Sequence, residues 1–154
     1  MKPGTLAHRA ARRITVWRAR DAARRALSAA SYGNCDEGHR LTARAAKAGP
    51  DAIVAMVEVW CDVITADIPD DERNDRCGPV FRHVISGDYV DPGEVPAPVR
   101  WFGQLLAAHV RGDTDTFVAL IRAVHPLELR MYLSGVLHAA AAVDVARNAD
   151  REWP

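Results

Sequence analysis

The strongest constraint on the fold is an apolar segment in the middle of the chain, at residues 50–66. Drawn as a helix, this segment carries apolar side chains around most of its circumference. The apolar positions are Ile53, Val54, Met56, Val57, Val59, Trp60, Val63 and Ile64. The one polar stripe holds Asp51, Glu58, Asp62 and Thr65. A helix that is apolar on most sides is buried, so we predict that residues 50–66 form the central helix of an all-α fold.

Two further helices are predicted before this central helix. Residues from about 5 to 30 are rich in Ala and Arg, which favour helix. A second helix is predicted from about Asn34 or Asp36 to Ala48, because Gly49 can take the left-handed conformation that ends helices and Pro50 suits the first turn of the next one. The N-terminal part of the chain is therefore predicted to hold three consecutive helices.

In the last third of the chain, apolar residues return at the i, i+3, i+4, i+7 spacing of amphipathic helices. Gly112 and Asp113 mark a helix stop followed by an N-cap, and Pro126 opens a last helix. Because the turns are short, residues 98–148 are predicted to form an antiparallel array. The predicted inward face of the last helix is Leu129, Tyr132, Leu133, Val136, Leu137 and Ala140. We predict that all 154 residues form one domain, a bundle of about five to seven helices.

Residues 67–98 interrupt the helical pattern. They contain five prolines and three glycines, which leave room only for a short helix around residues 80–86. Acidic side chains outnumber basic ones in this segment. A connector of this length is either functional or loosely ordered, so we treat residues 67–98 as an acidic connector within the domain.

Charge is sorted along the chain, although 20 basic and 20 acidic residues cancel overall. Residues 1–50 carry eleven basic and three acidic side chains, which gives a net charge of +8. Residues 51–98 carry three basic and eleven acidic side chains, which gives −8, and the rest of the chain carries six of each. The whole molecule therefore has no net field that attracts a polyanion or a membrane, and any electrostatic contact must use a local surface.

The basic surplus forms a stripe on the first predicted helix. Arg9, Arg13, Arg20 and Arg24 fall within about 60° of one another on a helical wheel, and Arg12 lies beside them. Two uses of this stripe remain open. It can contact the phosphates of a nucleic acid or a partner protein, or it can pair with acidic residues of the same chain.

The intramolecular alternative predicts a specific register. Three arginines of the stripe have the same spacing as three acidic residues of the central helix read backwards. Packed antiparallel, the two helices would pair Arg9 with Asp62, Arg13 with Glu58 and Arg20 with Asp51. In that case the first helix serves the fold, and the acidic connector becomes the better candidate contact surface.

The acidic surplus is concentrated at the start of the connector. Its members are Asp67, Asp70, Asp71, Glu72 and Asp75. They lack the Asp-x-Asp-x-Asp-Gly order of a calcium loop, so a solvated acidic loop is predicted. We take Asp70, Asp71, Glu72 and Asp75 as a candidate contact surface for a partner protein.

One pair of potential metal ligands has helical spacing. Cys35 and His39 are four residues apart and would share a helix face, but further ligands, from Cys77, His83 or another histidine, would have to join them. The chain has no CxxC and no HExxH motif. We therefore expect no metal site and no cofactor.

Catalytic motifs are equally scarce. The sequence GNCDEGHR at residues 33–40 has two glycines at phosphate-loop spacing, but His39 and Arg40 stand where Lys and Ser or Thr belong. Ser134 precedes a glycine inside a helical pattern rather than at a strand-to-helix elbow. An enzyme is therefore the minority interpretation, and no residue is nominated as catalytic.

The sequence also bears on the compartment. Three cysteines are an odd number with no disulfide pattern, and arginines interrupt the N-terminus before an apolar signal segment could form. The apolar run in residues 53–64 contains Glu58 and Asp62 and is too short to span a bilayer. We expect a cytoplasmic protein without a membrane segment.

Residues 100–124, with the sequence RWFGQLLAAHVRGDTDTFVALIRAV, lie in Ala- and Arg-rich surroundings. This stretch resembles uncharacterised small α-helical proteins of high-GC actinobacteria and their phages, and the resemblance covers about half of the chain. It implies a small helical protein and carries over neither an activity nor a site residue.

Two functions from different classes follow from these features. The first is a non-enzymatic helical module that binds a protein partner, in regulation or assembly, through the basic helix or the acidic connector. The alternative is a nucleic-acid-associated regulator that uses the arginine stripe, with a homo-oligomer doubling the basic surface.

Overall fold

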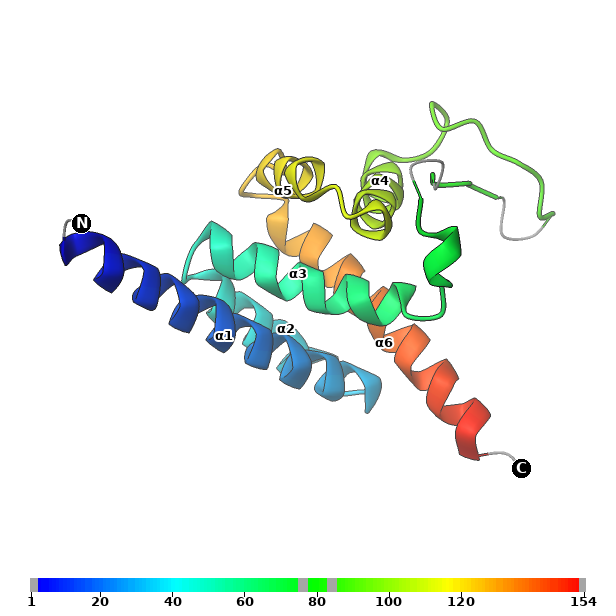
Figure 1. Ribbon diagram of the computed structural model, residues 1–154. Helices are drawn as coiled ribbons and strands as arrows, with labels where there is room; N and C mark the ends of the chain where they lie inside the picture. Colours follow the sequence, from blue (N-terminus) through cyan, green and yellow to red (C-terminus); the bar gives the residue numbers. More distant parts are fainter. Residues whose placement is uncertain (1–2, 75–77, 83–85, 153–154) are drawn as a thin grey trace. The chain divides into compact units, whose positions relative to one another are not determined.

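The computed structural model describes residues 3–74, 78–82 and 86–152 of the chain (Figure 1). The helices are α1 (Pro3–Ser31), α2 (Cys35–Ala46), α3 (Pro50–Thr65), α4 (Ala97–Arg111), α5 (Thr114–Arg122) and α6 (Leu129–Glu152), with a short 3₁₀ helix, η1 (Asp70–Glu72), after α3. The described residues contain no β-strand beyond one isolated bridge. The predicted all-α bundle of about five to seven helices is confirmed, since the described residues form six α-helices.

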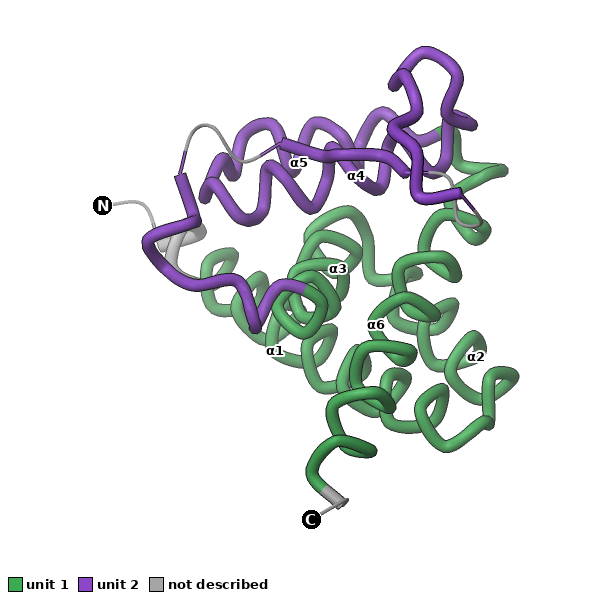
Figure 2. The backbone as a smooth tube through the Cα atoms, turned by 90° about the vertical axis from the view of Figure 1, so that its right-hand side faces the viewer, with its two compact units in different colours: residues 1–64, 125–154 green, residues 65–124 purple. Residues whose placement is uncertain are grey.

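The chain divides into two compact units, coloured separately in Figure 2. The first unit comprises residues 1–64 and 125–154, and the second comprises residues 65–124. The helices predicted as one C-terminal array are therefore divided, because α4 and α5 belong to the second unit and α6 belongs to the first. The organisation of all residues as a single domain stays a prediction.

In the first unit, two short connections reverse the chain direction. Asn34 caps α2 by accepting a hydrogen bond from the backbone N–H of Glu37. Gly49 follows α2 with a φ of 105°, a conformation that a residue with a side chain adopts only with strain. After two reversals, α3 runs in the same direction as α1 (Figure 1). This direction decides which side chains of α1 and α3 meet.

The core of the first unit is built around α3. Trp60 is completely buried, and its indole N–H donates a hydrogen bond of 3.1 Å to the carbonyl oxygen of Ala23 in α1. Small side chains on the inner face of α1 allow this approach, and they are Ala19, Ala23, Ala26 and Ala30. From α6, the buried residues Leu133, Val136, Leu137 and Ala140 confirm four of the six predicted inward positions. The predicted burial of the central helix is also confirmed, since Ala52, Met56 and Val57 are fully buried.

In the second unit, α4 and α5 form a helical hairpin. The helices are joined at Gly112 and Asp113, as predicted, and the Asp113 carboxylate accepts a hydrogen bond of 3.1 Å from the backbone N–H of Thr116. The side-chain hydrogen bond with Thr116, together with this backbone hydrogen bond, lowers the pKa of Asp113 below its ordinary value. The indole N–H of Trp101 in α4 donates a hydrogen bond to the carbonyl oxygen of Leu120 in α5, which ties the two helices together.

The connector contains no helix where the sequence predicts one, around residues 80–86, as far as this segment is described. Arg82 pairs with Tyr89 in an antiparallel β-bridge, and the N–H of Val90 donates a hydrogen bond of 3.0 Å to the carbonyl oxygen of Phe81. A hairpin competes with a helix here because Gly87, with a φ of 73°, supplies the turn. Residues 83–85 lie outside the described residues.

The connector also packs against α4 within the second unit. A Cβ atom added to Gly103 would lie 2.7 Å from the Phe81 ring and 2.9 Å from Pro79. The absence of a side chain at Gly103 thus lets the connector approach the helix backbone. The described part of the connector around Pro79 and Phe81 is therefore folded onto α4.

Candidate functional site

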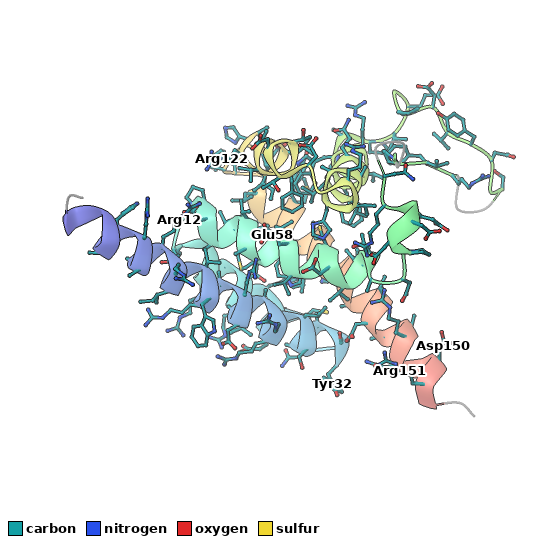
Figure 3. The ribbon with its side chains drawn as sticks, viewed as in Figure 1. Arg12, Tyr32, Glu58, Arg122, Asp150 and Arg151 are labelled. Carbon is teal, nitrogen blue, oxygen red and sulfur yellow. The ribbon has the colours of Figure 1, made fainter. Side chains whose placement is uncertain are left out.

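The arginine stripe of α1 meets the acidic stripe of α3 in two ion pairs. Arg12 Nε lies 2.7 Å from Asp51 Oδ2, and Arg20 Nη2 lies 2.9 Å from Glu58 Oε2. Figure 3 labels Arg12 and Glu58 on their respective helices. Pairing between the two stripes, which the sequence left as one of two uses, therefore occurs.

The predicted register of this pairing is wrong. Glu58 pairs with Arg20 rather than with Arg13, and Asp51 pairs with Arg12 rather than with Arg20. The antiparallel prediction was based only on the equal spacing of the arginines in α1 and the acidic residues in α3. It did not take into account the helix α2 between them. Because α2 adds a second chain reversal, α1 and α3 run parallel. Residues nearer the start of α1 therefore pair with residues nearer the start of α3.

Both ion pairs are accessible to solvent. The Arg12 side chain is 63% exposed and that of Arg20 is 47% exposed. The hydrogen bond from Arg12 to Asp51 raises the pKa of the Arg12 guanidinium. Exposed ion pairs contribute little to stability, so these pairs orient α1 more than they hold it.

Next to these contacts, α1 carries a basic and aromatic surface that is exposed to solvent. We call it the outer face of α1 and define it as Arg13, Ile14, Trp17 and Arg24. The tryptophan is 66% exposed and the isoleucine 52% exposed. Arg13 precedes Trp17 by four residues and Arg24 follows it by seven, so the two guanidinium groups flank the ring along the helix.

The five predicted arginines thus divide into two groups. Arg12 and Arg20 face α3, whereas Arg9, Arg13 and Arg24 are exposed. Within the described part of the chain, the three exposed arginines make no ion pair with an acidic side chain. The exposed arginines are therefore available to a partner, and Trp17 borders them on the same helix, as its position in the sequence indicates.

The acidic contact surface lies on η1 in the second unit. Asp70, Asp71 and Glu72 are exposed, and Asp70 lies 3.6 Å from the guanidinium of Arg73. Arg73 in turn donates hydrogen bonds to the carbonyl oxygens of Thr65 and Ile68. The three acidic side chains are thus presented on a turn that Arg73 fastens, while Asp75 lies outside the described residues.

A third cluster joins α2 and α6, and the sequence analysis missed it. His39 Nε2 lies 3.1 Å from His138 Nε2 and 2.7 Å from Ser134 Oγ. Ser134 and His138 are four residues apart and share one face of α6, but 99 positions separate the two histidines. The spacing on α6 was the only signal in the sequence, and it did not point to His39.

A small cavity of about 180 Å³ adjoins this cluster. Most of its lining is apolar, and polar side chains enter from His39, Thr42, Arg130 and Ser134. The apolar lining comprises Ala43, Ala46, Pro126, Leu129 and Leu133. The cluster therefore stands beside a space large enough for water or a small ligand.

The cluster does not form a hydrolase triad. Ser134 and His138 both contact the same nitrogen of His39, and among the described side chains no carboxylate contacts the other ring nitrogen. Ser134 also lies within a helix, where backbone N–H groups serve the helix instead of forming an oxyanion hole. The arrangement offers donor atoms for a ligand rather than an activated nucleophile.

The other candidates from the sequence are the glycine-containing segment at residues 33–40 and the cysteines. Glu37 and Arg40 form a bidentate ion pair at 2.6 Å, so residues 33–40 form a capped helix start. Cys35 is exposed and Cys61 is buried, and burial raises the pKa of the Cys61 thiol. Cys77 and His83, the further ligands considered for Cys35 and His39, lie outside the described residues.

Within the described ranges, no group of three or more His, Cys, Asp or Glu side chains is arranged to hold a metal ion. A search of the same residues finds no helix with the length and apolarity needed to cross a membrane. No family model, curated protein or solved structure matches the chain. The resemblance of residues 100–124 to small actinobacterial and phage proteins stays a prediction.

Proposed function

We propose that this protein is a helical interaction module that binds a partner protein through the outer face of α1. The observation that carries the proposal is Trp17, a large aromatic side chain that is 66% exposed between Arg13 and Arg24. Tryptophan and arginine are the residue types that most often dominate binding energy at protein interfaces. Because the inner face of α1 is already packed against the rest of the unit, the exposed Trp17 supports the interpretation of the outer face as a contact surface.

The inner face of α1 supports this surface by fixing the helix. Ala23 and Ala26 are fully buried, and the ion pairs of Arg12 and Arg20 orient α1 on α3. A helix held in this way loses little conformational freedom when its other face binds a partner. The internal ion pairs thus prepare the outer face without using its arginines.

The chemistry of the outer face defines the partner. Arg13 and Arg24 favour carboxylates, and Trp17 and Ile14 favour an apolar side chain. We therefore propose as partner an acidic protein segment with an apolar residue between its carboxylates. Regulation or assembly would follow from that contact, and no catalytic step is assigned.

A nucleic acid is the second candidate, favoured by the same alternation of arginines with an aromatic ring. Bases stack on tryptophan, while arginines neutralise the phosphates on either side. This candidate differs from the first in its dependence on salt, because phosphate contacts release bound counterions.

The test is affinity capture from an extract of the source cells, with quantitative identification of the bound protein and nucleic acid. The wild-type chain is compared with Arg13→Glu/Arg24→Glu and with Trp17→Ala. In both variants the affinity for the specific partner should fall at least about tenfold, which corresponds to about 1.4 kcal/mol of binding free energy. The matched control is Arg44→Glu/Arg122→Glu, which makes the same charge change at exposed positions on α2 and α5.

Three outcomes separate the candidates. Capture of a protein that survives nuclease treatment and is lost in both outer-face variants supports the first. Capture of nucleic acid whose affinity falls steeply with salt supports the second. Equal capture by the wild type, the outer-face variants and the control contradicts both, because it leaves the outer face without a role.

A further inference from the structure

We propose that His39 and His138 form a two-histidine binding site for a divalent transition metal ion of the zinc class. The proposal rests on the position of three donor atoms from two helices. His39 Nε2 in α2 lies 3.1 Å from His138 Nε2 and 2.7 Å from Ser134 Oγ, both in α6. These atoms converge although 95 and 99 positions separate their residues along the chain.

The distance between the two nitrogens suits a shared ion. Zinc binds imidazole nitrogen at about 2.0–2.1 Å, so two nitrogens 3.1 Å apart would subtend about 100° at the metal, close to a tetrahedral angle. The ring centroids are 4.9 Å apart and the planes are inclined by 54°, so the rings meet through their nitrogen edges rather than stacking face to face. The pair is therefore arranged for chelation with little movement.

The surroundings offer one further donor atom and space for water. Ser134 Oγ can act as a third donor or hold a metal-bound water, since it lies within hydrogen-bond distance of His39 Nε2. The adjoining cavity of about 180 Å³ is lined by His39 and Ser134 and gives room for water or a small anion. Arg130 also lines this cavity and would favour an anionic ligand.

The site differs from the metal site that the sequence spacing suggested. Cys35 lies four residues before His39, but the structure brings His138 rather than Cys35 against the His39 nitrogen. An imidazole pair selects zinc, copper or nickel over magnesium or calcium, which prefer oxygen ligands. A metal bound here would bridge α2 and α6 and stabilise their contact.

The experiment uses the full chain, freed of metal with a chelator, and titrates it with zinc chloride in a calorimeter and in thermal unfolding. The wild-type chain should bind one zinc ion and unfold at a higher temperature in its presence. His39→Ala and His138→Ala should each weaken zinc affinity at least about tenfold and abolish the thermal shift. His8→Ala, at an exposed position on α1, is the matched control and should leave both readouts unchanged.

Cobalt titration adds a readout of the ligand set, because thiolate and imidazole ligands give different visible spectra. Cys35→Ser should leave the cobalt spectrum and the zinc affinity unchanged. Circular dichroism of each metal-free variant verifies its helical fold, and His138→Gln serves as a second variant at that position if His138→Ala unfolds.

Three results would overturn the proposal. The first is the absence of stoichiometric zinc binding to the wild-type chain. The second is binding that persists in the His39→Ala/His138→Ala double variant, which would place the metal elsewhere. The third is binding that Cys35→Ser removes, which would assign the site to the cysteine and His39 instead of the histidine pair.

Discussion

The two faces of α1 carry the same residue types but have different roles. Arg12 and Arg20 pair with acidic residues of α3, and small alanines on the inner face allow Trp60 of α3 to reach the α1 backbone. On the outer face, Arg13 and Arg24 stand beside an exposed tryptophan. An excess of arginine in a helix is therefore not by itself a binding signal, because part of it can serve the fold.

The two tryptophans provide the largest expected contrast between these faces. Trp60→Ala removes a completely buried side chain and should lower the free energy of unfolding by about 3–5 kcal/mol. Trp17→Ala removes an exposed side chain and should change it by about 0.5 kcal/mol or less. Urea denaturation followed by circular dichroism measures both. A large loss of stability in Trp17→Ala would mean that the outer face belongs to the core.

Charge reversal gives a smaller contrast. Arg20→Glu would place a second carboxylate beside Glu58 and should lower the free energy of unfolding by about 1 kcal/mol or less, since both side chains are partly exposed. Arg24→Glu should leave it nearly unchanged. Thermal unfolding at low ionic strength measures the difference, which added salt should reduce. Restoration of stability in Arg20→Glu/Glu58→Arg would assign the loss to this ion pair.

The smallest expected effect is the coupling energy in a double-mutant cycle, which tests the parallel register of α1 and α3. Alanine substitutions at Arg20 and Glu58 should show a coupling energy of a few tenths of a kcal/mol, typical of an exposed pair. The cycle for Arg13 and Glu58, the pair of the antiparallel alignment, should show none. Coupling in the second cycle without coupling in the first would restore the antiparallel register.

Much of the fold follows from local patterns in the sequence. The apolar circumference of residues 50–66 predicts a buried helix, and α3 is the buried helix of the first unit. Gly49 and the Gly112 and Asp113 pair predict helix ends because backbone conformation and capping are decided by a few neighbouring residues. Such signals need no knowledge of distant contacts.

Contacts between distant segments were harder to predict. Charge spacing identified the stripes of α1 and α3 as partners, but spacing alone fits either direction, and counting chain reversals was needed to choose the parallel one. Among the described residues of the segment 80–86, the departure from a helix accompanies the packing of Phe81 and the neighbouring Pro79 at Gly103 of α4. The cluster of His39 with His138 arises only once α2 and α6 are packed, so no local pattern could reveal it.

The most direct test of the account uses the same substitution at two adjacent residues of α1. Arg12→Glu and Arg13→Glu change the charge equally, but the first residue pairs with Asp51 and the second is exposed on the outer face. Thermal unfolding and partner capture are measured for both. The account predicts that Arg12→Glu lowers the unfolding temperature and retains the partner, whereas Arg13→Glu retains the unfolding temperature and loses the partner. Equal effects of the two substitutions on both quantities would contradict the division between the faces of α1.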